Sequence, residues 1–287
     1  MITKTNNKIN LGSIVLNVKQ SPKDSRDRLF FCKNPNKLQS TLDLRNELNP
    51  VRNQGNQGTC YAQSAACMKE WQEKRDYNLN QYLSPQFFYN NRSNLYDNNE
   101  NNDDGMFGRD VMKLLKNIGI CYEKNYPYGL IEDKNKIDEQ LYEEASKHKI
   151  KAYARIDKIE DLKESLVKNG PCLIAFPTYS SDDEFWKPIY ENQEMIGGHA
   201  VTVVGYLDDC FIIRNSWGRY WGDNGYCYYK FKDWGAHWEI WTTIDEKTYE
   251  EIEPSPEPEI EPNLDILKKI VVKVITYIIE KLKKHIL

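Results

Sequence analysis

Residues 51–62 read VRNQGNQGTCYA and form a polar loop, interrupted by glycines, that runs into an alanine-rich segment. That segment, residues 60–76, has the composition and pattern of a helix. The loop therefore delivers Cys60 to a helix start, where unpaired N–H groups and the positive end of the helix dipole favour the thiolate, the reactive form of cysteine. A lone cysteine is more often core filler, so the case for Cys60 as a nucleophile depends on partners elsewhere in the chain.

Two polar side chains further along the chain are suitable partners. His199 lies in GGHAV, residues 197–201, at the mouth of an apolar strand pattern. A histidine can take up a thiol proton near neutral pH and return it to a leaving amine. Asn215 lies in RNSWG, residues 214–218, on a return strand that follows a tight connection. The predicted hairpin brings the two side chains together, so that the asparagine carbonyl would accept the imidazole N–H and fix the orientation of the ring.

The order of patterns along the chain predicts the fold class. Helical patterns occupy residues 60–76 and 108–118, and strand patterns rich in Val, Ile and Tyr follow at 171–176, 199–206, 210–214 and 225–231. Helices followed by strands are typical of an α+β architecture with two lobes and not of a parallel sheet built from βαβ units. A cleft between the lobes is the natural place for a site.

With His199 and Asn215 placed 139 and 155 residues after Cys60, the chain resembles the papain family (peptidase C1-like) of cysteine proteases. The resemblance extends over residues 20–244 and includes LDLR at 42–45, LSPQ at 83–86, YPY at 126–128 and NSWG at 215–218. It implies a papain-like α+β fold in which a helical lobe precedes an antiparallel β-barrel-like lobe, with the active site in the cleft between them. The short N-terminal arm resembles that of intracellular, bacterial-type members of the family.

The resemblance also implies a role for each site residue. Cys60 is the nucleophile, His199 the general base and then acid, and Asn215 the residue that orients the imidazole. Gln54 matches the side chain that completes the oxyanion hole together with the backbone N–H of Cys60. Trp217 matches the indole that shields the contact between histidine and asparagine from water.

The residues expected to bind substrate match the family pattern less completely than the catalytic residues do. Gly105 corresponds to a position that binds the substrate backbone on the acyl side of the scissile bond, and Gly198 to another position that binds the substrate backbone, but Met106 stands where the family has a second glycine after Gly105. In the family, the first cysteine of the signature forms a disulfide with a cysteine further along the chain. The first position is Gln57 here, and no cysteine stands near Gly105, where the second is expected. Both ends of that disulfide are therefore absent together.

The implied reaction is peptide-bond hydrolysis by a thiol endopeptidase, which acts on protein or peptide substrates through a thioester acyl-enzyme and uses no metal and no cofactor. Two alternatives stay open at this point. The same site could pass the acyl group to an amine or act as a deamidase, which product analysis would distinguish. The fold could also be a non-catalytic scaffold for the C-terminal segment, in which case Cys60 would not react with a thiol-directed epoxide.

Composition and charge indicate which classes of partner are excluded and in which compartment the protein is expected. The 287 residues are 40% hydrophobic and 29% charged with a net charge of −4, an ordinary globular balance without the basic face that nucleic acid binding requires. The seven cysteines form no C-x-x-C pair, and neither a signal peptide nor a membrane span is visible, so we expect an intracellular protein. The wealth of Asn, Lys, Ile and Tyr is typical of AT-rich genomes and raises packaging in the virion of a large DNA virus as a hypothesis. Cysteines inside helix and strand patterns are expected to be buried thiols: Cys67, Cys172, Cys210 and Cys227.

Four segments divide the chain. Residues 1–37 form an N-terminal arm, which we expect to fold against the body and leave the cleft open, and residues 38–244 form the papain-like domain. Residues 245–263 carry eight acidic residues and one lysine among several prolines, which predicts a stiff linker. Residues 264–287 carry six lysines and two acidic residues, with the apolar residues on one helical face, which predicts a basic amphipathic helix. That helix is expected to bind a membrane surface or a protein partner, to dock on its own domain or to self-associate.

Overall fold

The computed structural model describes residues 14–92, 105–130 and 134–245. The first 13 residues of the predicted arm, nearly all of the predicted acidic linker and the whole predicted tail helix lie outside the described residues. The chain divides into two units, residues 1–249 and 250–287, and the described residues belong entirely to the first.

The helices of this unit all precede its five longest strands, whereas two shorter strands come earlier in the chain. The helices are α1 (Cys60–Tyr77), α2 (Pro85–Asn90), α3 (Gly108–Asn117), α4 (Glu139–Ser146) and α5 (Ile159–Asn169). The strands are β1 (Leu42–Asp43), β2 (Ala152–Arg155), β3 (Cys172–Thr178), β4 (Gly197–Tyr206), β5 (Cys210–Arg214), β6 (Tyr226–Lys230) and β7 (Glu239–Ile244). Short 3-10 turns lie at Pro35–Lys37, Arg45–Glu47, Lys134–Lys136 and Phe231–Asp233. The predicted order of helices before strands is therefore confirmed for β3 to β7, whereas β2 precedes α5.

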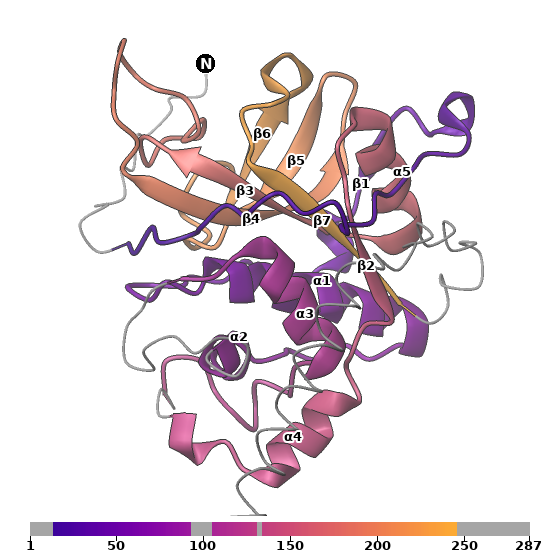
Figure 1. Ribbon diagram of the computed structural model, residues 1–287, viewed down its shortest axis with the longest axis vertical. Helices are drawn as coiled ribbons and strands as arrows, with labels where there is room; N and C mark the ends of the chain where they lie inside the picture. The colour runs from indigo at the N-terminus through magenta and orange to yellow at the C-terminus, as the bar shows by residue number, and fades with distance from the viewer. Residues whose placement is uncertain (1–13, 93–104, 131–133, 246–287) are drawn as a thin grey trace, which may run out of the picture. The chain divides into compact units, whose positions relative to one another are not determined.

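The strands form one antiparallel sheet in the order β2-β7-β3-β4-β5-β6, and β1 pairs with β4 outside that path. The sheet is open within the described residues, because its two ends, β2 and β6, do not pair with each other. The α+β class with an antiparallel sheet is thus confirmed, whereas the barrel-like closure is not seen. Figure 1 shows the sheet on one side of the molecule and α1 to α4 on the other.

Helix α1 is the central helix of the core, and most of its residues are buried, polar ones included. Its buried charges are paired: Lys69 Nζ lies 2.8 Å from Glu73 Oε1 and also contacts the carboxylate of Asp245 at the end of β7. Pairing is required because an isolated buried charge would cost several kcal/mol. The helix ends where Asn78 adopts a left-handed conformation with φ 57°.

Strands β4 and β5 form the hairpin that the sequence predicts. Their register pairs Thr202 with Arg214, so extending it by one residue sets Asn215 opposite Val201, two residues along β4 from His199. Diagonal neighbours of this kind lie within reach of each other across a sheet. On its other side β4 pairs with β3, where Phe176 is the partner of His199.

Candidate active site

Cys60 is the first residue of α1 and is fully buried. The residue before it, Thr59, is the N-cap, and its hydroxyl lies 2.7 Å from the hydroxyl of Tyr128. The hydroxyl of Tyr128 donates to the carbonyl of Gln54 at 2.7 Å, so Thr59 must be the donor in the first contact. Tyr128 therefore joins the two ends of the loop that precedes the thiol. In the sequence Tyr128 stood out only as the last residue of the YPY motif at 126–128, and no local pattern indicated this bracing contact.

His199 and Asn215 are in direct contact, with 2.8 Å between imidazole Nε2 and amide Oδ1. The backbone N–H of Ser216 donates to the same Oδ1 at 2.7 Å, and only an oxygen can accept that bond, which fixes the orientation of the amide. Because Oδ1 only accepts, Nε2 of His199 carries the proton of this contact. In the neutral ring Nδ1 is then the basic nitrogen, and it has no hydrogen-bond partner among the described residues.

Aromatic side chains enclose the imidazole. Trp217 stacks on the ring of His199 with 4.5 Å between centroids and 22° between planes, and Phe185 meets it edge-on at 5.5 Å. His199 is completely buried, and this burial lowers its pKa to about 4, against the opposing effect of the hydrogen bond to Asn215. The ring is thus neutral at pH 7 and able to accept a proton.

Gln54 connects the loop before Cys60 to the loop after β5. Its backbone N–H donates to the carbonyl of Ser216 at 2.8 Å, and its side-chain oxygen accepts from the hydroxyl of Ser216 at 2.7 Å. Its side-chain nitrogen donates to the carbonyl of Gln57 at 3.0 Å. An amide nitrogen carries two hydrogens, so this contact leaves one for a further acceptor. The buried Gln54 is therefore held rigidly beside the start of α1 with one donor to spare.

The two glycines expected to bind substrate lie against the N-terminal arm. Gly198 donates its N–H to the carbonyl of Leu16 and accepts from the N–H of Val18, both at 3.3 Å. Gly105 has φ +71°, and a Cβ added there would lie 2.0 Å from the carbonyl oxygen of Asn17. In Figure 1 the arm, drawn in indigo, crosses in front of the sheet. The arm packs against the body as expected, but it does so along the two positions predicted to hold the substrate backbone.

A buried carboxylate fastens this arm. Glu239 Oε1 accepts from the backbone N–H of Ser21 at 3.3 Å, from the N–H of Gly108 at 3.2 Å and from the hydroxyl of Tyr61 at 2.9 Å. Arg109 adds a bidentate contact, with Nε and Nη2 each 2.7 Å from the carboxylate of Asp27. Sequence reasoning missed Glu239, although a glutamate opening an otherwise uncharged run, EIWTTI, is a signal that could have marked it.

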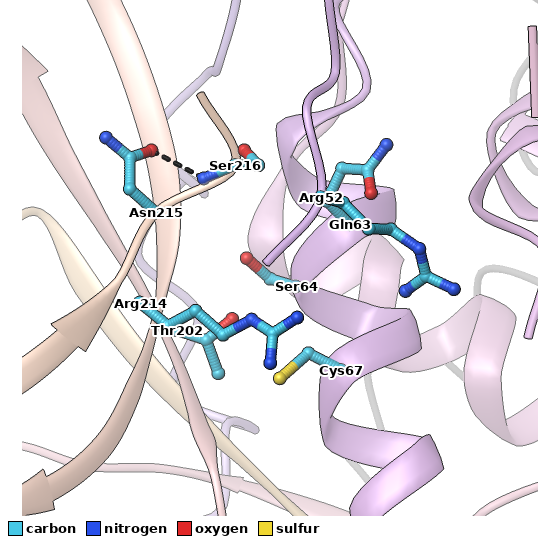
Figure 2. A pocket seen from close by; sticks show the side chains of 8 residues that line it. All are labelled: Arg52, Gln63, Ser64, Cys67, Thr202, Arg214, Asn215 and Ser216. Carbon is cyan, nitrogen blue, oxygen red and sulfur yellow. Dashed lines mark hydrogen bonds between the residues drawn. The ribbon is translucent and has the colours of Figure 1, made fainter. Parts of the chain in front are cut away.

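A small cavity of about 10 Å³ lies behind the site (Figure 2). That volume holds about one water molecule, so the cavity is too small for substrate. Figure 2 shows the side chain of Cys67 beside Arg214, whose guanidinium donates to the carbonyls of Asn49 and Pro50 at 2.6 and 2.7 Å. Its lining consists of Arg52, Gln63, Ser64, Cys67, Thr202, Arg214, Asn215 and Ser216.

The cysteines other than Cys60 are unsuited to nucleophilic chemistry. Desolvation raises the pKa of each, for example to about 11 at Cys32 and to about 12 at Cys172, so they stay protonated at neutral pH. The buried thiols predicted from the sequence are confirmed as buried: Cys67, Cys172, Cys210 and Cys227.

The described residues contain no group of three or more His, Cys, Asp or Glu side chains placed to hold a metal ion. None of their helices combines the length and the apolar character needed to cross a bilayer.

Asn91 begins an Asn-Arg-Ser sequon, but its side chain is buried. Its amide nitrogen donates to the carbonyl of Phe87 and its amide oxygen accepts from the hydroxyl of Tyr142, which prevents glycosylation of the folded chain.

Comparison with known proteins gives consistent matches. The family model described as papain family cysteine protease matches residues 38–240. An uncharacterized peptidase C1-like protein of Acanthamoeba polyphaga mimivirus is 30% identical over 207 residues, which cover 66% of each chain. A cathepsin L-like peptidase of Aedes aegypti is 30% identical over 202 residues, or 65% of this chain and 57% of the other. Xylellain, a cysteine protease from Xylella fastidiosa, superposes with a TM-score of 0.72 at 27% identity over 82% of this chain and 98% of its own.

The chain spans between about two-fifths and two-thirds of the length of these curated relatives and of a gamete and mating-type specific protein of Dictyostelium discoideum that it also matches. The family model nevertheless covers well over half of this chain and includes Cys60, His199 and Asn215. This protein belongs to the papain family of cysteine proteases.

Proposed function

We propose that this protein is a thiol peptidase that hydrolyses peptide bonds at a site formed by Cys60, His199 and Asn215. The observation that carries the proposal is the contact between His199 Nε2 and Asn215 Oδ1, because it leaves Nδ1 of a neutral, buried imidazole as the base. Cys60 stands at the start of α1, where the helix dipole and unpaired N–H groups stabilise a thiolate. Base and nucleophile belong to elements that pack on each other, since Cys60 and Ala200 share one core cluster.

The reaction would begin when the thiol of Cys60 gives its proton to Nδ1 of His199. The thiolate then attacks the substrate carbonyl, and the developing oxyanion accepts hydrogen bonds from the Cys60 backbone N–H and from the remaining hydrogen of Gln54 Nε2. One such donor is typically worth about 10²–10³ in rate. The imidazolium protonates the leaving amine as the thioester forms, and water activated by the same ring hydrolyses the thioester.

Trp217 and Asn215 would act on the imidazole and not on the substrate. The indole excludes water from the contact with His199, and the amide keeps the ring in the tautomer that exposes Nδ1. The thiolate and the imidazolium stabilise each other, so the pH–rate profile is expected to be bell-shaped with limbs that belong to the pair.

The test is hydrolysis of a peptide mixture by the full chain and by its Cys60→Ala variant, with products identified by mass spectrometry. We expect cleaved peptides that gain one water with the natural chain, and none above background with the variant. Intact hydrolysis by Cys60→Ala would contradict the proposed mechanism. Products joined to an added amine, or side-chain amides converted to acids without chain cleavage, would assign the same site to acyl transfer or deamidation.

A further inference from the structure

The loop between β3 and β4, residues 179–196, carries the most concentrated exposed apolar surface of the described residues. Ile189, Tyr190, Met195 and Ile196 are 64%, 66%, 55% and 48% exposed, and all four lie within eight consecutive positions. We call these four side chains the 189–196 patch. Clustered apolar exposure of this kind marks an interaction surface more often than a scattered apolar residue does.

The loop is held in a defined shape. The side-chain nitrogen of Gln193 donates to the carbonyl of Tyr179 at 2.8 Å, and its oxygen accepts from the N–H of Ile189 at 2.7 Å. The backbone N–H of Ile196 donates to the carbonyl of Thr178 at 2.8 Å, where the loop rejoins the sheet. The patch is therefore presented outward by a braced loop that does not fold its apolar side chains inward.

The inner side of the same loop packs on the proposed catalytic groups. Phe185 contacts His199 at 5.5 Å and Trp217 at 5.6 Å between ring centroids. Trp221, four residues after Trp217, donates its indole N–H to the carbonyl of Ser181 at 2.7 Å. Ile196 lies immediately before β4, and His199 is the third residue of that strand. The three residue steps between them span about 10 Å at the rise of a β-strand. An extended substrate covers that distance with about three residues.

The arm indicates which part of a substrate passes the loop. It runs from Gly197 past Gly198 to Met106, that is, away from the loop and towards Gly105, the position predicted to bind the acyl side of the substrate. Because the patch lies at the Gly197 end of this path, it faces residues that follow the scissile bond.

The charge of loop 179–196 indicates which substrate side chains would bind beside the patch. Loop 179–196 carries five exposed acidic side chains and one lysine, and Lys187 is already paired with Glu184 and Asp233 at 2.7 Å each. The exposed acids are Asp182, Asp183, Glu184, Glu191 and Glu194. An apolar patch within an acidic surface matches a partner segment that is both apolar and basic.

We propose that the 189–196 patch binds the part of a peptide substrate that follows the scissile bond and selects apolar and basic residues there, within about three or four residues of the cleavage point. The inference rests on the proposed peptidase function, and it adds a substrate class to it. It commits to the substrate because the loop that carries the patch also packs on His199.

The test compares two internally quenched peptides with the same acyl side. Their second to fourth residues after the scissile bond are Leu, Lys and Leu in one peptide and Ser, Glu and Ser in the other. We expect the full chain to prefer the first by about tenfold in kcat/KM, expressed mainly in KM, which corresponds to about 1.4 kcal/mol. Since both peptides compete with the arm on the same acyl side, the ratio is independent of how often the arm opens.

Matched variants assign the preference to the patch. Tyr190→Ser and Glu194→Lys are each expected to lower the ratio severalfold, as truncation of one contributing interface residue does. Tyr77→Ser, on an exposed tyrosine at the end of α1, and Glu143→Lys, on the exposed face of α4, should leave the ratio unchanged. The charge variant keeps the test decisive if Tyr190→Ser does not fold.

Three results would overturn the inference while leaving the peptidase intact. The first is a kcat/KM ratio near one in the natural chain, and the second is a ratio that neither patch variant changes. The third is a dimer, seen by size-exclusion chromatography, that becomes a monomer in Tyr190→Ser while the ratio stays the same. The last result would assign the patch to a second copy of the chain. Failure of the proposed function has a different signature, since the natural chain would then cleave neither peptide, or the Cys60→Ala variant would cleave both as fast as the natural chain does.

Discussion

The contact of the arm with Gly105 and Gly198 predicts that loosening the arm increases activity. The change is Asp27→Asn, which keeps the size of the side chain and removes the charge that Arg109 holds at 2.7 Å through two nitrogens. The Asp27 side chain is 8% exposed and that of Arg109 13%, so water screens the pair only weakly. A hydrogen bond to a charged group in such a place is worth about 1.5–3 kcal/mol.

That energy sets the expected size of the effect. Each 1.4 kcal/mol is a factor of ten, so the fraction of molecules with the arm detached should rise about 10- to 100-fold. If substrate needs the glycines that the arm covers, the initial rate at low substrate concentration rises by the same factor until the open form predominates. The assay is the initial rate on a quenched peptide with the full chain, together with the rate at which a second protease cleaves the arm.

Asp24→Asn is the matched control within the same arm. Asp24 pairs with Arg26, whose side chain is 83% exposed, and water screens a surface pair of this kind so strongly that it contributes little to stability. We expect no change in peptide hydrolysis or in arm cleavage with this variant. The reasoning is refuted if Asp27→Asn makes the arm more easily cleaved and yet leaves the rate of peptide hydrolysis as it was.

Three other predictions follow from the same geometry. Gln54→Ala should lower kcat by about 10²–10³ with KM nearly unchanged, as measured by steady-state kinetics; an equal loss in a variant that no longer folds by circular dichroism would not count as support. Tyr128→Phe removes the hydroxyl that donates to the carbonyl of Gln54. It should lower the free energy of unfolding, measured in urea, by about 1–3 kcal/mol, and the folded variant should have a lower kcat. Burial lowers the pKa of His199 and of His237 to about 4, below the unfolded value near 6.5, so each contributes stability above pH 6.5 that is lost as the pH falls towards 4. Urea unfolding at pH 7 and pH 5 should show this loss, on the order of 3 kcal/mol per histidine at its limit, and His237→Gln should reduce it; a stability that rises between pH 7 and pH 5 would contradict the assignment.

Features that depend on neighbours in sequence were predictable, and those that depend on distant neighbours were not. A polar loop before an alanine-rich run was enough to predict that Cys60 begins a helix, and a tight connection between two apolar runs predicted the hairpin that joins His199 to Asn215. The open edges of the sheet depend on which strands meet in space, and no local pattern carries that information.

The route of the arm shows the same limit. Ser21 and Glu239 are 218 residues apart in sequence, and their hydrogen bond depends on how β7, α1 and α3 converge. The sequence indicated an arm and two glycines separately, but only the folded chain shows that the arm lies along those glycines. The tautomer of His199 likewise required the second donor to Asn215, the N–H of Ser216, which a motif does not show.

The central claim is that Cys60 is made nucleophilic by His199, and covalent labelling tests it most directly. The full chain and its His199→Ala variant are treated with a thiol-directed epoxide between pH 4 and pH 9, and the modified residue is located by mass spectrometry. We predict a single label on Cys60 of the folded chain, with a rate that depends on pH as a bell and falls at least a hundredfold in the variant. Labelling of another of the seven cysteines in preference to Cys60, or an equal rate without His199, would contradict the account.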